Sequence, residues 1–224
     1  MTHDAKQPCG RDVRPLMEGW TFHKPGEKAR PVALPHTWNA RDGQDGGNDY
    51  WRGTCIYRTH FAAPQFNTAS HQVWIQFDGV NASAHVVLNG SPVCNHDGGY
   101  STFRANITEL LRDENELTVE VDNSKNDRVY PQKADFTFYG GIYRDVSLMV
   151  VSKNHFTLDY FGGPGIKVTP KPTEDGGATF EIESWVTNGE EAYTVMYSIE
   201  DCYGNEVASG VRPCDSTKVT LYVP

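Results

Sequence analysis

The residues best suited to chemistry lie between Asp135 and Tyr139, where a carboxylate stands among aromatic side chains. Asp135 is followed by two phenylalanines and Tyr139, and then by the pair Gly140-Gly141. A carboxylate accepts hydrogen bonds from two neighbouring hydroxyl groups at once, and aromatic faces pack against the apolar C–H faces of a sugar ring. The glycines permit positive φ or the close approach of another chain or ligand. The segment therefore predicts a sugar pocket, although its composition is equally typical of an aromatic-rich turn packed on the core.

Composition and charge narrow the classes of partner. The chain has 224 residues, a net charge of −9 and a pI of about 5.3. An acidic chain without a basic stripe is a poor match for nucleic acid or an anionic membrane surface, and no apolar run approaches the roughly 20 residues of a membrane helix. A neutral sugar fits. No basic segment followed by an apolar one marks a signal peptide, so we expect a cytoplasmic protein, or a periplasmic one if such a peptide was removed.

The sequence predicts no metal site. The five cysteines include no Cys-x-x-Cys pair, so free thiols in a reducing compartment are expected, with a Cys202–Cys214 bridge left open. The histidines lack the His-x-x-x-His spacing of metal helices. Asp42, Asp45 and Asp49 share a glycine-rich segment but lack the calcium-loop pattern. That segment is expected to be a solvated loop.

Alternating apolar residues predict an all-β fold. Strands are expected at residues 54–61, 73–78, 84–88 and 117–121, where apolar side chains recur at every second position. Asn89-Gly90 predicts a tight hairpin, because both residues tolerate positive φ in a type I′ turn. No long segment shows the 3.6-residue period of an amphipathic helix. Short strands separated by turn signals favour a β-sandwich or jelly roll.

A change of pattern after Val151 predicts a domain boundary. Residues 152–155 are polar and residues 162–165 read Gly-Gly-Pro-Gly. Beyond them, strands are expected at residues 167–169, 179–187, 193–200 and 218–223. This second unit resembles an immunoglobulin-like β-sandwich but holds about 70 residues against about 100 for a complete one. We therefore predict domains at residues 12–152 and 153–224, the second of them truncated.

Seven segments together resemble one family. They are residues 34–39 (LPHTWN), 57–61 (YRTHF), 77–81 (FDGVN), 87–90 (VLNG), 98–103 (GGYSTF), 119–123 (VEVDN) and 139–146 (YGGIYRDV). In this order and spacing they are similar to the N-terminal sugar-binding domain of glycoside hydrolase family 2, the group of β-galactosidases, β-glucuronidases and β-mannosidases. The likeness covers most of residues 12–152. It implies a galactose-binding-like jelly roll.

The resemblance also implies an activity that this chain does not carry by itself. In the family, a (β/α)₈ barrel supplies the two glutamates of a retaining mechanism, and such a barrel needs roughly 250 further residues. We therefore expect no catalytic residue here and no hydrolysis by this chain alone. The expected parent is a β-galactosidase, with a β-glucuronidase next. An autonomous carbohydrate-binding module and a structural spacer remain alternatives, because fold alone does not settle function.

The resemblance finally suggests which residues meet the sugar. Asp135 matches the family acid that binds sugar hydroxyls, and Asn39 and His36 belong to a segment that approaches the pocket, with Tyr139 as the neighbouring aromatic. For Asn39, the explanation as a turn residue at the start of the glycine-rich loop is favoured over contact with the sugar. No cofactor is expected in this chain, although the full enzyme could hold a monovalent or magnesium cation. The expected partners are a β-galactoside or β-glucuronide, a homo-oligomeric parent, and self-association of this chain through exposed sheet edges.

Overall fold

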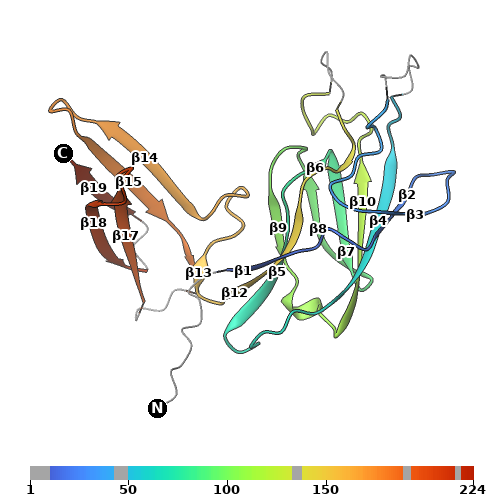
Figure 1. Cartoon of the computed structure of the whole chain (residues 1–224), viewed down its shortest axis with the longest axis horizontal. Coiled ribbons are helices and arrows are strands. Elements are labelled where there is room, and N and C mark those ends of the chain that lie inside the picture. Colours follow the sequence, from blue (N-terminus) through green and yellow to red (C-terminus); the bar gives the residue numbers. More distant parts are fainter. Residues whose placement is uncertain (1–10, 43–49, 133–137, 189–192, 215–217) are drawn as a thin grey trace. The chain divides into compact units, whose positions relative to one another are not determined.

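A computed structural model describes residues 11–42, 50–132, 138–188, 193–214 and 218–224 (Figure 1). In these ranges the secondary structure consists of β-strands and one short 3₁₀ helix, η1 (Thr108–Leu110). The all-β prediction is therefore confirmed. None of the described residues forms a helix long and apolar enough to cross a membrane. The chain divides into two compact units, Met1–Ser152 and Lys153–Pro224, and each is described by itself.

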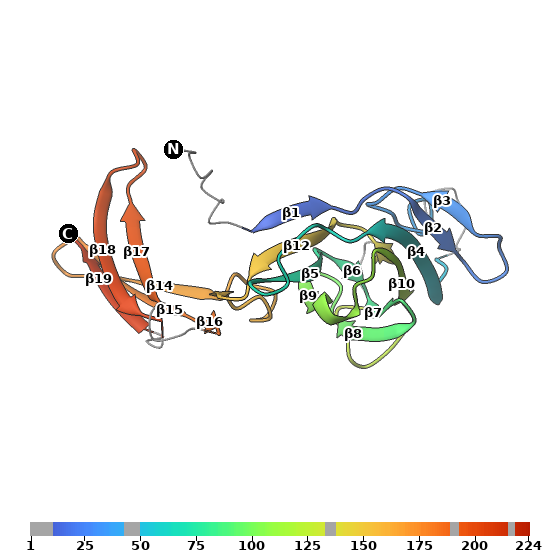
Figure 2. The same ribbon diagram turned by 90° about the horizontal axis from the view of Figure 1, so that it is seen from below.

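Two antiparallel sheets build the first unit (Figure 2). The smaller one runs in the order β1 (Asp12–Pro15), β12 (Val146–Ser152), β5 (His71–Phe77) and β9 (Phe103–Asn106). The larger one runs in the order β3 (Arg30–Val32), β2 (Trp20–His23), β4 (Thr54–Ala62), β10 (Glu114–Asp122), β7 (Ser83–Leu88) and β8 (Ser91–Asp97). A short ladder joins β6 (Val80–Asn81) to β11 (Gly141–Ile142).

The core of the first unit follows directly from the period of two in the strands. In β4, β5, β7 and β10, burial alternates residue by residue, because successive side chains point to opposite faces of a sheet. The inward side chains of both sheets form one apolar cluster, in which the rings of Phe77 and Phe103 stack 4.8 Å apart. Asn89 and Gly90 both have positive φ between β7 and β8. The predicted strands and the predicted hairpin are therefore confirmed.

The second unit is smaller. Its strands are β13 (His155–Phe156), β14 (Ile166–Pro172), β15 (Ala178–Ser184), β16 (Val186–Thr187), β17 (Thr194–Glu200), β18 (Glu206–Pro213) and β19 (Lys218–Val223). A three-stranded sheet, β14-β15-β19, and the β17–β18 hairpin share one apolar cluster, and β18 lies beside β19 (Figure 2). The sheets are tied by a hydrogen bond of 2.7 Å between the hydroxyls of Ser184 and Tyr197. The immunoglobulin-like assignment stays a prediction.

Two strands of this unit were missing from the sequence-based prediction, the two-residue β13 and the longer β18, and the reason can be given for β18. Its residues opposite Ile199 and Tyr197 are Ala208 and Gly210. A Cβ atom at Gly210 would lie 3.0 Å from Leu221, so the sheet packing leaves little room for a side chain there. Small residues at the inward positions erase the apolar alternation by which a strand is recognised.

A buried amide fixes the start of β10. Asn115 is 1% exposed. Its Nδ2 donates to the carbonyls of Arg112 (2.8 Å) and Phe61 (3.3 Å), and its Oδ1 accepts from Asn89 Nδ2 and the Arg112 amide, both at 2.9 Å. All the usual hydrogen bonds of the side chain are thus made inside the protein.

Because of these bonds, replacing Asn115 by an aspartate of the same shape should destabilise the protein. In Asn115→Asp, a carboxylate oxygen would replace the group that donates to two carbonyls. Because a buried charge facing acceptors is uncompensated, we expect the free energy of unfolding to fall by about 3 kcal/mol in urea titrations near pH 7. Asn95→Asp, on the exposed side of β8, serves as the matched control and should change stability by less than about 0.5 kcal/mol. Equal effects of the two changes would contradict this role.

Candidate functional site

Asp135 lies outside the described residues. The candidate site is therefore defined by the residues that flank it. The chain enters the segment after Gln132 and leaves it at Phe138. Arg52 Nη2 donates to the Gln132 carbonyl at 3.2 Å, and the Tyr50 hydroxyl donates to the Phe138 carbonyl. Both ends of residues 133–137 are therefore held by side chains that lie just before β4.

Asn39 is a buried tie between separate segments. Its side chain is fully buried. Nδ2 donates to Asp42 Oδ2 at 2.6 Å and to the Trp51 carbonyl at 2.9 Å, while Oδ1 accepts from the Gly140 amide at 2.8 Å and from Asn123 Nδ2 at 3.1 Å. These four bonds use the donors and acceptors of the amide. The geometry therefore gives Asn39 a positioning role, and direct contact with a sugar stays a prediction.

His36 is partly buried, and its backbone amide donates a hydrogen bond of 2.8 Å to the Ile142 carbonyl. Nε2 lies 3.2 Å from Arg30 Nη2, and Nδ1 lies 2.7 Å from the Tyr57 hydroxyl. A guanidinium only donates, so Nε2 is the acceptor, and the proton of the neutral ring is assigned to Nδ1. Burial first, and the charge of Arg30 second, lower the pKa of His36 from an ordinary 6.5 to about 4. His36 is therefore neutral at physiological pH, and its ring packs 4.7 Å from Phe22.

The residues after Asp135 combine exposure with very close packing. Tyr139 is 40% exposed, and its carbonyl accepts a hydrogen bond of 2.9 Å from Asn81 Nδ2. A Cβ atom at Gly140 would lie 2.3 Å from the Trp38 ring, and one at Gly141 would lie 2.5 Å from the His36 carbonyl. The two glycines are therefore needed for close approach within the protein. They place Tyr139 at the surface beside the segment that holds Asp135.

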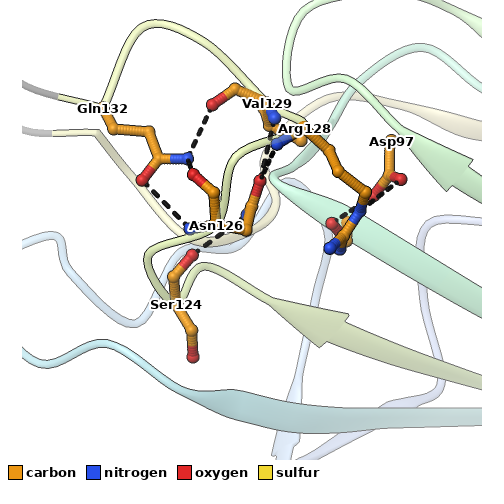
Figure 3. Close-up of polar contacts among 7 residues, drawn as sticks. Asp97, Ser124, Asn126, Arg128, Val129 and Gln132 are labelled. Carbon is orange, nitrogen blue, oxygen red and sulfur yellow. Dashed lines mark hydrogen bonds and ion pairs between the residues drawn. The ribbon is translucent and has the colours of Figure 1, made fainter.

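A cluster of hydrogen bonds shapes the loop before Asp135 (Figure 3). Asn126 Oδ1 accepts from the amides of Arg128 and Val129 at 2.9 and 2.8 Å, and its Nδ2 donates to the Ser124 carbonyl at 3.1 Å. Gln132 Oε1 accepts from the Asn126 amide at 3.2 Å, and Gln132 Nε2 donates to the carbonyls of Val129, at 2.7 Å, and Asn126. The loop is thereby closed on itself up to the last described residue before Asp135.

An ion pair anchors this loop to β8. Arg128 Nε donates to Asp97 Oδ2 at 2.8 Å, and the Ser83 hydroxyl donates to Asp97 Oδ1 at 2.5 Å. The bond from Arg128, followed by that from Ser83, lowers the pKa of Asp97. Sequence reasoning missed Asn126, Gln132 and Arg128. The available signal was an Asn two residues before an Arg, because a short polar side chain commonly bonds the amide two residues on.

A hollow of about 20 Å³ lies between this loop and β6. Its lining includes Arg52, Asn81, Asn123, Gln132 and Phe138. That volume suits one water molecule rather than a sugar ring. The described residues also bring together no group of three His, Cys, Asp or Glu side chains able to hold a metal ion. What the described site offers is therefore a rigid frame and a polar rim.

Comparisons with known proteins identify the relatives of this chain. Residues 44–152 match the family model described as "Glycosyl hydrolases family 2, sugar binding domain". A β-glucuronidase of Bacteroides fragilis is 37% identical over 158 residues, which are 67% of this chain and 22% of that protein. A β-galactosidase of Thermoanaerobacter pseudethanolicus is 33% identical over 151 residues, or 65% of this chain and 20% of that protein.

A solved structure is more similar still. The crystal structure of an FMN-binding β-glucuronidase from Facaelibacterium prausnitzii L2-6 has 53% sequence identity and a TM-score of 0.90, and the likeness covers 96% of this chain and 34% of that one. The chain thus spans about a fifth of the length of the two curated relatives and about a third of this structure.

The pair Asn39–Asp42 allows a test of the buried tie. Asn39→Asp would set two carboxylates against each other, so we expect a loss of about 3 kcal/mol in the free energy of unfolding. In Asn39→Asp/Asp42→Asn, donor and acceptor are exchanged, and at least about 1 kcal/mol should return, measured as a double-mutant cycle in urea. Strictly additive losses would show that the bond between Asn39 and Asp42 does not organise this region.

The lowered pKa of His36 predicts a dependence of stability on pH. The unfolded ring binds a proton near pH 6.5 and the folded ring only near pH 4. Between these values the unfolded state binds more protons, so the contribution of His36 is present above pH 6.5 and is lost as the pH falls toward 4. Asn at this position keeps a donor for Tyr57 but cannot titrate. We therefore expect thermal unfolding, followed by circular dichroism from pH 7.5 to 4.5, to decline more steeply in the natural protein than in His36→Asn. Parallel curves would argue against it.

Proposed function

The chain belongs to glycoside hydrolase family 2 through its sugar-binding domain, and on this premise we propose that it forms the non-catalytic, sugar-facing wall of a β-glucuronidase. The observation that carries the proposal is the frame around residues 133–137. The Gly140 amide donates a hydrogen bond to Asn39 Oδ1. The carbonyls of Gln132 and Phe138, at the two ends of the frame, accept hydrogen bonds from Arg52 and Tyr50. Asp135 belongs to residues 133–137, which connect these two ends in the sequence.

The proposed division of labour follows from the chemistry of glycoside cleavage. Retaining hydrolysis needs two carboxyl groups about 5 Å apart on either side of the scissile bond. We place those groups in another part of a longer polypeptide, as the length of the curated relatives suggests. The role of Asp135 is then to accept hydrogen bonds from sugar hydroxyls and hold the ring in register, with Tyr139 packing against an apolar sugar face. Asn39 and His36 are then positioning residues, which hold the backbone around Asp135 and Tyr139 in place.

The proposed sugar differs from our first expectation. The sequence analysis placed a β-galactoside ahead of a β-glucuronide. Of the relatives described above, those with 53% and 37% identity are β-glucuronidases, and the one with 33% identity is a β-galactosidase. The greater similarity to the two β-glucuronidases supports a uronic acid as the substrate sugar.

The proposal predicts both a preference and a sensitive residue. In the polypeptide that also carries the catalytic domain, kcat/KM for an aryl β-glucuronide should exceed that for the matching galactoside. Asp135→Asn should lower kcat/KM by roughly a hundredfold, because an amide cannot accept the charge-assisted bonds of a carboxylate. Initial-rate kinetics on both substrates provide the measurement.

Glu109→Gln, an exposed acid in η1, is the control and should leave the rates unchanged. The two parts of the proposal fail separately. A preference for galactoside would remove the glucuronide assignment alone. An Asp135→Asn enzyme with unaltered kcat/KM for every glycoside would remove the contact between this chain and the substrate.

A further inference from the structure

A tight turn in the second unit carries an aromatic residue where one is sterically disfavoured. Phe161 and Gly162 have φ of 47° and 71°, and the Gly163 amide donates to the Tyr160 carbonyl at 2.7 Å. Positive φ at both central residues makes this a type I′ turn, whose first central position normally holds Asn, Asp or Gly. For a bulky side chain the left-handed region is an outlier.

The contacts of this ring with the described residues bury little of its surface. Phe161 is 91% exposed, so its side chain gains little from burial. A backbone outlier combined with an exposed aromatic ring is a pattern that points to function, because strain of this kind is retained where it positions a group for a ligand.

The neighbouring rings make a defined shape with Phe161. Tyr160 stacks on Trp185 with centroids 4.3 Å apart and an interplanar angle of 23°, and Phe161 stands at 74° to Tyr160 with centroids 5.1 Å apart. The Trp185 backbone is fixed by hydrogen bonds from its amide to Gly165 (3.0 Å) and from the Thr157 amide to its carbonyl (2.9 Å). The three rings, Tyr160, Phe161 and Trp185, form what we call the aromatic corner.

We propose that the aromatic corner is a carbohydrate-binding site that takes a neutral pyranose ring. One C–H face of such a ring packs on an aromatic face, and the second wall of the corner limits how far the sugar slides. Asp159, the exposed residue directly before the corner, supplies a carboxylate that accepts hydrogen bonds from sugar hydroxyls.

Charge decides between a neutral sugar and other ring-shaped ligands. The segment that forms the turn brings a local negative charge, Asp159. Like charges disfavour an anionic ligand. The corner should therefore reject glucuronate and FMN, although both have a ring that can stack, and should accept uncharged methyl glycosides and short β-linked oligosaccharides.

Binding is tested on the 224-residue chain itself. Saturation-transfer NMR and tryptophan fluorescence are recorded with methyl β-D-glucopyranoside, methyl β-D-galactopyranoside and cellobiose, and with glucuronate and FMN as the anionic arms. We expect saturable binding of at least one neutral pyranoside, weakened roughly tenfold or more in Phe161→Asn through loss of the stacking surface. Tyr203→Asn is the matched control, because Tyr203 is 86% exposed in the turn between β17 and β18 but lies outside the aromatic corner. It should bind like the natural chain.

Stability separates a ligand site from a structural residue. Asn adopts positive φ more readily than Phe, so Phe161→Asn should leave the unfolding temperature unchanged or raise it while sugar binding falls. The proposal is overturned if no neutral pyranoside binds, if FMN or glucuronate binds while neutral sugars do not, or if Phe161→Asn lowers the unfolding temperature as a packing residue would. None of these outcomes depends on Asp135, so this site and the proposed sugar-facing wall are tested independently.

Discussion

The buried amide of Asn39 is the constraint on which the candidate site depends. Its hydrogen bonds join Asp42 and Trp51 on one side to Asn123 and Gly140 on the other. Asn123 and Gly140 are 84 and 101 positions from Asn39 in the chain, so these two partners are not brought there by local structure. An amide placed in an apolar interior must find partners for its donors and acceptors. Meeting that requirement fixes how the segment before Asp135 and the segment after it come together.

Glycine makes this convergence possible. The Asn39 bond to the Gly140 amide needs the backbone to lie directly on the Trp38 ring, and a single methyl group at Gly140 would overlap that ring at 2.3 Å. Tyr139 is carried to the surface by the same backbone path. Two features thus shape the site: the close packing of Gly140 on Trp38, and the hydrogen-bonded loop of Asn126 and Gln132 (Figure 3). A rim built on fixed backbone is well suited to holding a sugar in one orientation.

The sequence predicted the all-β class and the strands β4, β5, β7 and β10 of the first unit, but not the hydrogen bonds that organise the site. Strands such as β5 and β10 bury every second residue, and that period is visible in any alternating sequence. The strand β18 was not predicted, because Ala208 and Gly210 occupy its inward positions and leave no apolar alternation. The burial of Asn39 could not be foreseen either, since a lone Asn before a glycine-rich loop looks the same whether its partners are water or a residue a hundred positions away.

The overlap at Gly140 has a bearing on how this family can diverge. No substitution at position 140 fits while Trp38 remains, and a smaller side chain at position 38 would open a void beside the Phe22 and Trp51 rings that now pack on it. A Cβ atom at position 140 would also lie 2.6 Å from Asn123 Nδ2, so a smaller side chain at position 38 does not by itself make room for it. We expect homologues to alter positions 38, 123 and 140 only in concert, so that covariation among them in related sequences marks the lineages in which the rim has been rebuilt.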